Sequence, residues 1–247
     1  MITLERLKIL DTPVDVVDMA GALDFVDRYI AGADKPGYIL AVNPEKVYAL
    51  RENPFLKDFF QEAALLIPDG IGMVYAMRLL AGKKVSRVPG ADLMQQICAR
   101  SAGNGHRIFI YGATEEVNRG AVEELQNRYP GINIVGRANG YVKPEEMDAL
   151  VERINRAGTD ILFVALGSPR QEKWLHEHLP KLSIKLAQGI GGTLDTITGH
   201  VKRAPQVFQS LGLEWFYRLA SQPSRAGRQK RLPLFAWEIL TAKLRRK

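Results

Sequence analysis

The feature that most constrains the fold is a regular alternation of short apolar runs with segments of helical periodicity. Apolar runs typical of buried strands lie at residues 38–42, 64–67, 107–111, 132–135, 161–166 and 184–187. Helices are expected at residues 14–31, 44–51, 71–80, 91–102, 115–128, 143–157, 169–179 and 192–198. Such alternation is typical of parallel sheets joined by crossover helices. We predict an α/β, Rossmann-like fold with a mostly parallel sheet and flanking helices, preceded by a strand at residues 2–10.

The composition is that of an ordinary globular protein. The chain has 247 residues, of which 46% are hydrophobic and 25% are charged, and these values argue against both disorder and an integral membrane protein. No apolar run approaches the roughly 18 residues that span a bilayer, and the N-terminus mixes acidic with apolar residues, unlike a secretory signal. The single cysteine, Cys98, excludes an internal disulfide framework and fits a reducing compartment. We expect a cytoplasmic protein.

The positive charge of the chain is concentrated at its C-terminal end. Residues 213–247 contain nine lysines and arginines and two glutamates, and the whole chain has a net charge of +7, so residues 1–212 carry no net charge. Composition shifts near Ala204-Pro205, which predicts a domain at residues 1–204 and a helical, basic appendage at residues 205–247. The basic residues are interleaved with Trp, Phe and Leu, a combination typical of peripheral binding to an anionic membrane surface. Nucleic acid would suit the same charges, but no nucleic-acid-binding motif accompanies them.

Two candidate site residues follow neighbouring predicted strands. Asn43 precedes Pro44 and fits a helix N-cap, although its amide could also bind a sugar hydroxyl or a base edge. Asp69 stands between an apolar strand and a helix, among apolar and glycine neighbours. It fits either a structural N-cap or a general base whose pKa is tuned by partial burial. In open α/β sheets ligands bind outside the carboxyl ends of the strands, where both residues are expected.

Three further strand-to-helix junctions could bind an anion. Thr114 follows Gly112 in a turn that could present backbone N–H groups to a pyrophosphate, or could be an ordinary loop. Arg170, Gln171 and Lys173 lie in the first turns of a helix, where cations suggest an anionic ligand or a solvated face. Gly191 and Gly192 allow close backbone approach to a phosphate or sugar, with tight packing as the alternative.

Several enzyme classes lack their motifs in this chain. There is no P-loop, no Gly-x-Ser-x-Gly nucleophile elbow and no complete dinucleotide fingerprint. The four histidines show no metal-ligand spacing, and His176 and His178 are expected on different faces of one helix, at the surface. No Asp-x-Asp pair is available to hold a metal on a nucleotide diphosphate. If the chain transfers a sugar from a nucleotide, another group must offset the charge of the leaving diphosphate, and the arginines of the appendage are candidates.

A set of motifs runs in order from about residue 38 to residue 228. They read AVNPEKVYALRENP, LLIPDGIGM, RVPGADLM, FIYGATEE, LGSPRQEKW, GIGGTLD, RAP and GLEWFYRL followed by PSRAGR. Together they resemble the WecG/TagA/CpsF glycosyltransferases. The resemblance implies a Rossmann-like fold of the GT-E type and an inverting, metal-independent transfer that needs no cofactor. It also implies a UDP-sugar donor, often of N-acetylmannosamine, and an undecaprenyl-diphosphate-linked sugar acceptor in teichoic acid or other cell-surface polysaccharide synthesis.

The resemblance implies roles for individual residues. Asp69 matches the proposed catalytic base, and Asn43 and Gln171 match polar residues of the sugar pocket. Three arginines of the appendage match those proposed to complete the site and bind the diphosphate, namely Arg218, Arg225 and Arg228. Ala41 departs from the pattern, since some members have Thr there.

Other functions remain open from the sequence alone. A nicotinamide-dependent oxidoreductase could use the same sheet edge, although the fingerprint glycines and the acidic ribose partner are missing. A non-catalytic scaffold could bind anionic lipid or nucleic acid through the appendage. We expect the appendage to bind the inner face of the cell membrane and not nucleic acid, and its exposed apolar residues also favour self-association.

Overall fold

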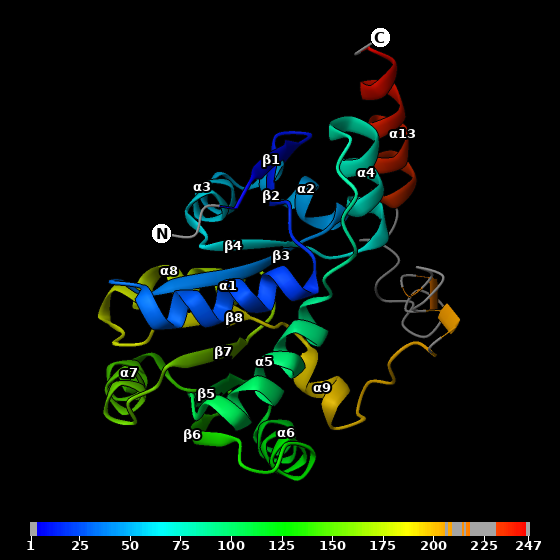
Figure 1. Cartoon of the computed structure of the whole chain (residues 1–247). Coiled ribbons are helices and arrows are strands. Elements are labelled where there is room, and N and C mark those ends of the chain that lie inside the picture. The colour runs from blue at the N-terminus through cyan, green and yellow to red at the C-terminus, as the bar shows by residue number, and fades with distance from the viewer. Residues whose placement is uncertain (1–3, 206, 209–213, 215, 218–230, 246–247) are drawn as a thin grey trace.

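The computed structural model describes residues 4–205, 207–208, 214, 216–217 and 231–245. Its centre is a six-stranded parallel sheet with the strand order β4-β3-β8-β7-β5-β6 (Figure 1). In that order the strands are Leu65–Pro68, Gly37–Val42, Leu186–Gly189, Ile161–Ala165, Arg107–Gly112 and Asn133–Ala138. The predicted α/β, Rossmann-like fold is confirmed.

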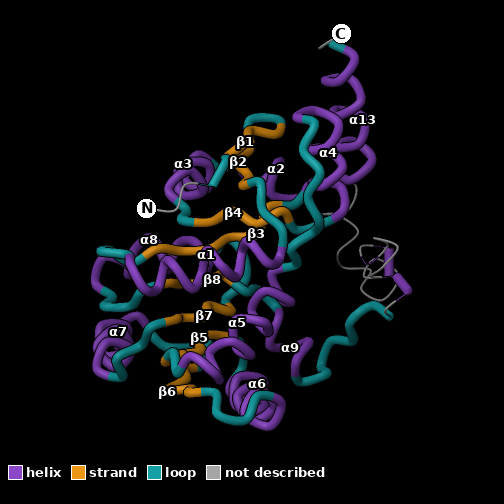
Figure 2. The backbone as a smooth tube through the Cα atoms, viewed as in Figure 1, coloured by secondary structure: helices purple, strands orange, loops and turns teal. Residues whose placement is uncertain are grey.

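Helices cover both faces of the sheet (Figure 2). The core on one face is completed by α2, α3, α4, α7 and α8, which span Pro44–Glu52, Pro54–Glu62, Ile71–Ala81, Met147–Arg156 and Arg170–His178. The core on the other face is completed by α1, α5, α6 and α9, which span Met19–Gly32, Gly90–Asn104, Glu115–Arg128 and Thr193–Ile197. A short 3₁₀ helix, Pro144–Glu146, directly precedes α7, and another, Leu179–Lys181, directly follows α8.

Strand side chains alternate between the two cores, as the pleat requires. On β3, Leu40 and Val42 pack in the first core and Ile39 packs in the second. Because both faces are covered, the strands are apolar almost throughout, which is why they were visible as continuous runs in the sequence. Cys98 is buried in the second core, and burial raises the pKa of its thiol to about 12.

The N-terminal prediction was wrong in detail. The expected strand at residues 2–10 contains β1 (Arg6–Ile9). The expected helix start at residue 14 was wrong, because β2 (Thr12–Asp15) lies there and pairs with β1 as an antiparallel hairpin. Leu10 and Asp11 form its turn with positive φ angles of 48° and 64°, the conformation that tight hairpin turns need. Helix α1 begins only at Met19, where the side chain of Asp18 accepts a hydrogen bond from the Gly21 N–H group.

Other boundaries differ by smaller amounts. Helix α3 was missed, although Asn53-Pro54 repeats the Asn43-Pro44 start of α2 and Asn53 caps it. Strands β6 and β8 end two or three residues later than predicted. The helix expected at residues 143–157 divides into a 3₁₀ turn and α7. None of these shifts alters the order of strands and helices in the parallel sheet.

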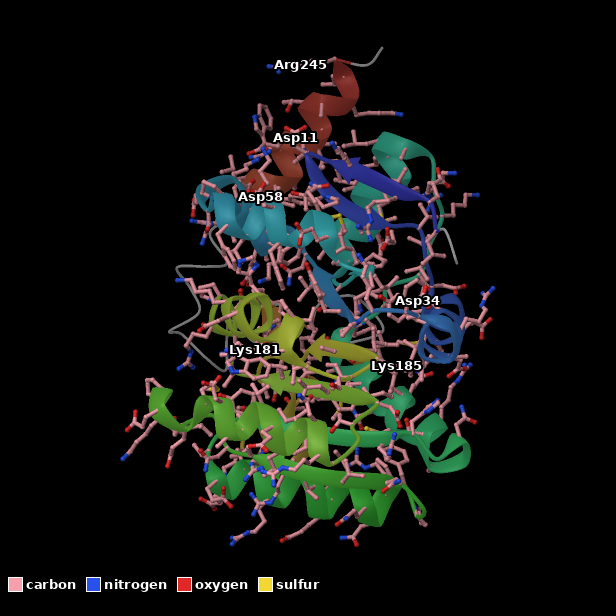
Figure 3. All side chains as sticks on the ribbon, turned by 90° about the vertical axis from the view of Figure 1, so that its left-hand side faces the viewer. Asp11, Asp34, Asp58, Lys181, Lys185 and Arg245 are labelled. Carbon is pink, nitrogen blue, oxygen red and sulfur yellow. The ribbon has the colours of Figure 1, made fainter. Side chains whose placement is uncertain are left out.

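The described end of the appendage is a helix that packs on the body. Helix α13 (Arg231–Leu244) lies beside α4 (Figure 1) and buries Phe235 and Ile239 in the first core. Arg245 lies at one extreme of the molecule, beyond Asp11 of the hairpin (Figure 3). Among the described residues, no helix has both the length and the apolar character needed to cross a membrane.

Candidate active site

The carboxyl ends of the parallel strands place the predicted site residues along one edge of the sheet. Asp69 follows β4, Asn43 follows β3, and Gly191 and Gly192 follow β8. Gln171 lies in the first turn of α8, the helix that follows β7, and Thr114 follows β5. Since the strands are parallel, the order of the sheet sets the order of these residues along the edge.

Asn43 and Asp69 are direct neighbours. Their strands pair in register, with Val42 opposite Pro68, and the Asp69 N–H group donates to the Val42 carbonyl at 2.9 Å. A methyl group added at Gly70 would lie 3.7 Å from Cβ of Asn43. Gly70 adopts a φ of 100°, which favours glycine. Asp69 is half-buried and stands one residue before Gly70, the N-cap of α4.

Two ion pairs connect α5 and the loop before it with the chain that follows α9. Arg203 donates to Asp92 of α5 at 2.8 Å, and Arg87 donates to Glu214 of the appendage at 3.1 Å. The hydrogen bond to Asp92 raises the pKa of Arg203, and the negative charges of Glu214 and Asp69 raise it further. Arg203 and Asp69 therefore lie close enough for their opposite charges to interact.

Gln171 and Gly191 are joined by a hydrogen bond across the end of the sheet. Oε1 of Gln171 accepts from the Gly191 N–H group at 3.0 Å, and the Gln171 side chain is buried. A methyl group added at Gly189 would lie 2.6 Å from Nε2 of Gln171. Gly191 adopts a φ of 53°. The glycines of this loop therefore allow the Gln171 amide to lie against the end of β8.

An open cleft of about 420 Å³ lies beside Asn43. Its walls come from α2, α3 and the turn between β7 and α8, and its lining includes Asn43, Lys46 and Ser168. Lys46 donates to Oε1 of Glu172 at 2.7 Å and also to Ser168. Glu172 is fully buried while the Lys46 side chain is 15% exposed. The ion pair thus joins α2 to α8 through a residue of the cleft lining, Lys46.

Helix α13 supplies part of the cleft wall. Arg231, its first residue, lines the cleft and donates to both carboxylate oxygens of Glu52 at 2.8 and 3.0 Å. Farther along the helix, Glu238 accepts from Arg51 at 2.8 Å and from Tyr48 at 3.1 Å. The hydrogen bond from Arg51 is the largest cause that holds the pKa of Glu238 below its usual value. The appendage therefore contacts the candidate site through described residues.

Some predicted residues lie apart from this group. Thr114 is exposed at the end of β5 and caps α6 by accepting from the Val117 N–H group at 3.3 Å. Four strand spacings separate β4 from β5, about 19 Å in all. Arg170 and Lys173 are exposed on α8. Arg218, Arg225 and Arg228 lie outside the described residues.

No group of three or more His, Cys, Asp or Glu side chains in the described part of the chain is arranged to hold a metal ion. The expectation that His178 lies at the surface was wrong. His178 is buried against Trp174, with ring centroids 5.0 Å apart, and burial lowers its pKa. It is a packing residue of α8.

The sequence analysis missed the polar contacts of the cleft. Lys46 and Glu172 are 126 positions apart, and Arg231 and Glu52 are 179 positions apart. No periodicity or spacing joins residues that far apart, so only the folded chain brings these charges together. One local signal was available, because Glu172 is an acidic residue in the first turn of a helix, yet this signal equally predicts an exposed carboxylate.

A family comparison agrees with the geometry. The model of the glycosyl transferase WecG/TagA/CpsF family matches residues 7–247, nearly the whole chain. The match includes the sheet, the edge that carries Asn43 and Asp69, and helix α13. The chain belongs to the WecG/TagA/CpsF family and is a glycosyltransferase.

Proposed function

We propose that the chain transfers a hexose, N-acetylmannosamine or a related sugar, from a UDP-sugar to a sugar linked to undecaprenyl diphosphate. The observation that carries the proposal is the pairing of Asp69 and Asn43 at the ends of adjacent strands beside an open cleft. A carboxylate next to an amide gives a proton acceptor and a group that orients hydroxyls. Membership of a glycosyltransferase family makes a nicotinamide-dependent oxidation the wrong chemistry for this edge.

In the proposed reaction Asp69 takes the proton of the acceptor hydroxyl as its oxygen attacks the anomeric carbon of the donor. The new glycosidic bond forms while the bond from the anomeric carbon to the UDP oxygen breaks, so the configuration inverts. UDP leaves with the bonding electron pair. No metal and no cofactor takes part in this proposal. Arg218, Arg225 and Arg228 would offset the charge of the leaving UDP or bind the lipid diphosphate.

The remaining site residues have proposed binding roles. Gln171 and Asn43 would orient sugar hydroxyls, since each presents an amide at the sheet edge. Gly191, Gly192 and Thr114 would present backbone N–H groups or a hydroxyl to the nucleotide part of the donor. Thr114 is far from Asp69, so it could contact only an extended part of the substrate.

Helix α13 supports the proposed membrane contact. Opposite its buried face, it exposes Leu234, Trp237, Leu240 and Leu244, and the neighbouring helix α4 exposes Tyr75 and Leu79. The nine lysines and arginines of residues 213–247 lie in the same part of the sequence. Apolar and aromatic side chains combined with cations are typical of helices at an anionic bilayer surface. The proposal places the enzyme on the inner face of the cell membrane, where a lipid-linked acceptor is held.

Replacement of Asp69 tests the proposed base. Asp69→Asn is expected to reduce transfer at least a hundredfold, since general base catalysis contributes roughly that much or more, while UDP binding and the melting temperature stay close to wild type. The assay incubates the protein with a panel of UDP-sugars and a polyprenyl-diphosphate-linked acceptor and weighs the products. Asp58→Asn, at an exposed position on α3, is the matched control (Figure 3). Full transfer by Asp69→Asn would remove Asp69 from the mechanism.

A further inference from the structure

The cleft beside Asn43 has the balance of charges that a neutral ligand requires. The two cations that line it among the described residues are already paired with carboxylates, Lys46 with Glu172 and Arg231 with Glu52. Glu45 adds a further acidic group to the lining. Among the described residues that line the cleft, a phosphate would therefore meet no excess of positive charge. The lining instead fits a ligand that exchanges neutral hydrogen bonds.

The same lining offers what a sugar ring needs. Asn43, Asn53 and Ser168 add neutral hydrogen-bonding groups to the paired charges, and Ala49, Leu56 and Pro169 provide apolar surface for the C–H face of a ring. The volume of about 420 Å³ lies within the range of roughly 300–1,000 Å³ that is usual for small-molecule sites.

Lys46 is held in place with a donor to spare. An ammonium group has three N–H donors. Lys46 uses two of them, toward Oε1 of Glu172 and toward Ser168, which leaves the third for a ligand. Glu172 is fully buried, and its second oxygen has no hydrogen-bond partner among the described residues. The buried carboxylate thus depends on Lys46 and fixes the ammonium group in return. A fixed donor recognises a hydroxyl at a lower entropic cost than a mobile lysine does.

The cleft also lies next to the candidate base. Asn43 lines the cleft and is adjacent to Asp69, and its Oδ1 accepts from the backbone N–H group of Lys46 at 3.0 Å. That bond leaves the Asn43 amide nitrogen to donate to a ligand. We propose that this cleft binds a sugar ring of one of the two substrates and that Lys46, fixed by Glu172 and Ser168, donates a hydrogen bond to it. The assignment rests on the proposed glycosyl transfer.

A double variant tests the assignment without leaving a buried charge alone. Lys46→Met/Glu172→Gln removes the ammonium group and its carboxylate together, so it avoids the penalty of an unpaired buried ion. We expect the KM of one sugar-bearing substrate to rise about tenfold, the effect of one lost hydrogen bond to a charged group, with the affinity for free UDP unchanged. Lys57→Met, exposed on the adjacent helix α3, is the control and should match wild type. Melting temperatures establish that both variants fold.

The two sources of the sugar give different results. A higher KM for the UDP-sugar alone assigns the cleft to the donor hexose, and a higher KM for the lipid-linked substrate alone assigns it to the acceptor. A folded double variant with both KM values and kcat equal to wild type overturns the assignment. If the double variant does not fold, Ser168→Ala, at an exposed position that contacts Lys46, is measured in the same way, and unchanged KM values again overturn it. Absence of transfer by the wild-type protein would instead refute the proposed function itself.

Discussion

At the scale of single residues, each buried carboxylate in the described part of the chain forms an ion pair. Asp15 shows this away from the site: it is 1% exposed and accepts from Arg6 at 2.7 and 2.9 Å and from the Leu66 N–H group at 2.7 Å. It thereby attaches the N-terminal hairpin to the edge strand β4. Glu172 does the same for α2 and α8 near the site. Asp69 is less buried than Asp15 and Glu172, and it follows the carboxyl end of β4.

Removal of the Asp15 carboxylate should destabilise the protein. Asp15→Ala is expected to lower the free energy of unfolding by roughly 2 to 3 kcal/mol, because the Leu66 N–H group is left buried without its acceptor. Asp34→Ala, at an exposed position, should change it by less than about 0.5 kcal/mol. Urea denaturation of the two variants measures both values. Equal stabilities would show that the hairpin does not depend on Asp15.

Position 189 offers a second test at this scale. Gly189→Ala would place a methyl group 2.6 Å from Nε2 of Gln171, so the amide must turn away and lose its bond to Gly191. Because only the end of a flexible side chain must move, we expect a loss of stability of about 1 kcal/mol together with the same fall in transfer activity as Gln171→Ala. Kinetics and thermal melting of both variants check this. A fully active Gly189→Ala would separate Gln171 from the reaction.

At the scale of elements, the sequence was informative wherever local physics decides the outcome. Helix α6 was predicted with its correct ends because Thr114 caps it and acidic residues occupy its first turn. The hairpin was missed because its turn uses Leu10 and Asp11 at positive φ in place of the expected glycine or asparagine. The helical character of the appendage was predicted and helix α13 confirms it, but its packing was not predicted, since its burial depends on α4 and α2, which lie far from it in the sequence.

The contact between α13 and α2 should depend on pH. The pKa of Glu238 is lowered in the folded protein from its ordinary value of 4.5, chiefly by Arg51. Its contribution is therefore complete above pH 4.5 and is lost as the pH falls through the lowered value. Because this pair is partly exposed, Glu238→Gln should cost only about 0.5 kcal/mol at pH 7, and the difference from wild type should vanish below the lowered pKa. Denaturation at a series of pH values measures it, with the exposed Glu145→Gln as control.

At the scale of the whole molecule, one helix connects three features of the protein. Helix α13 packs its inner face in the core, lines the cleft with Arg231 and exposes apolar side chains on its outer face. The strand order that brings Asn43 beside Asp69 was not predicted from the sequence, since the pairing of strands is not local. The same holds for the cleft, whose charges come from helices at opposite ends of the chain.

The two faces of α13 should respond differently to mutation. Trp237→Ser/Leu240→Ser, at positions 66% and 53% exposed, is expected to weaken binding to anionic vesicles severalfold and to leave the melting temperature unchanged. Phe235→Ala, at a position 3% exposed, should instead cost roughly 3 kcal/mol of stability. Vesicle co-sedimentation and thermal melting separate these effects. Vesicle binding that survives the double substitution would assign docking to another surface.

The burial of Cys98 has a practical consequence for such measurements. A thiol whose pKa is raised to about 12 has almost no thiolate near neutral pH, and the chain contains no other cysteine. The native protein is therefore expected to resist alkylation by maleimides. It can serve as its own background for labelling, so a fluorophore attached to a cysteine introduced at position 237 would report insertion into lipid directly.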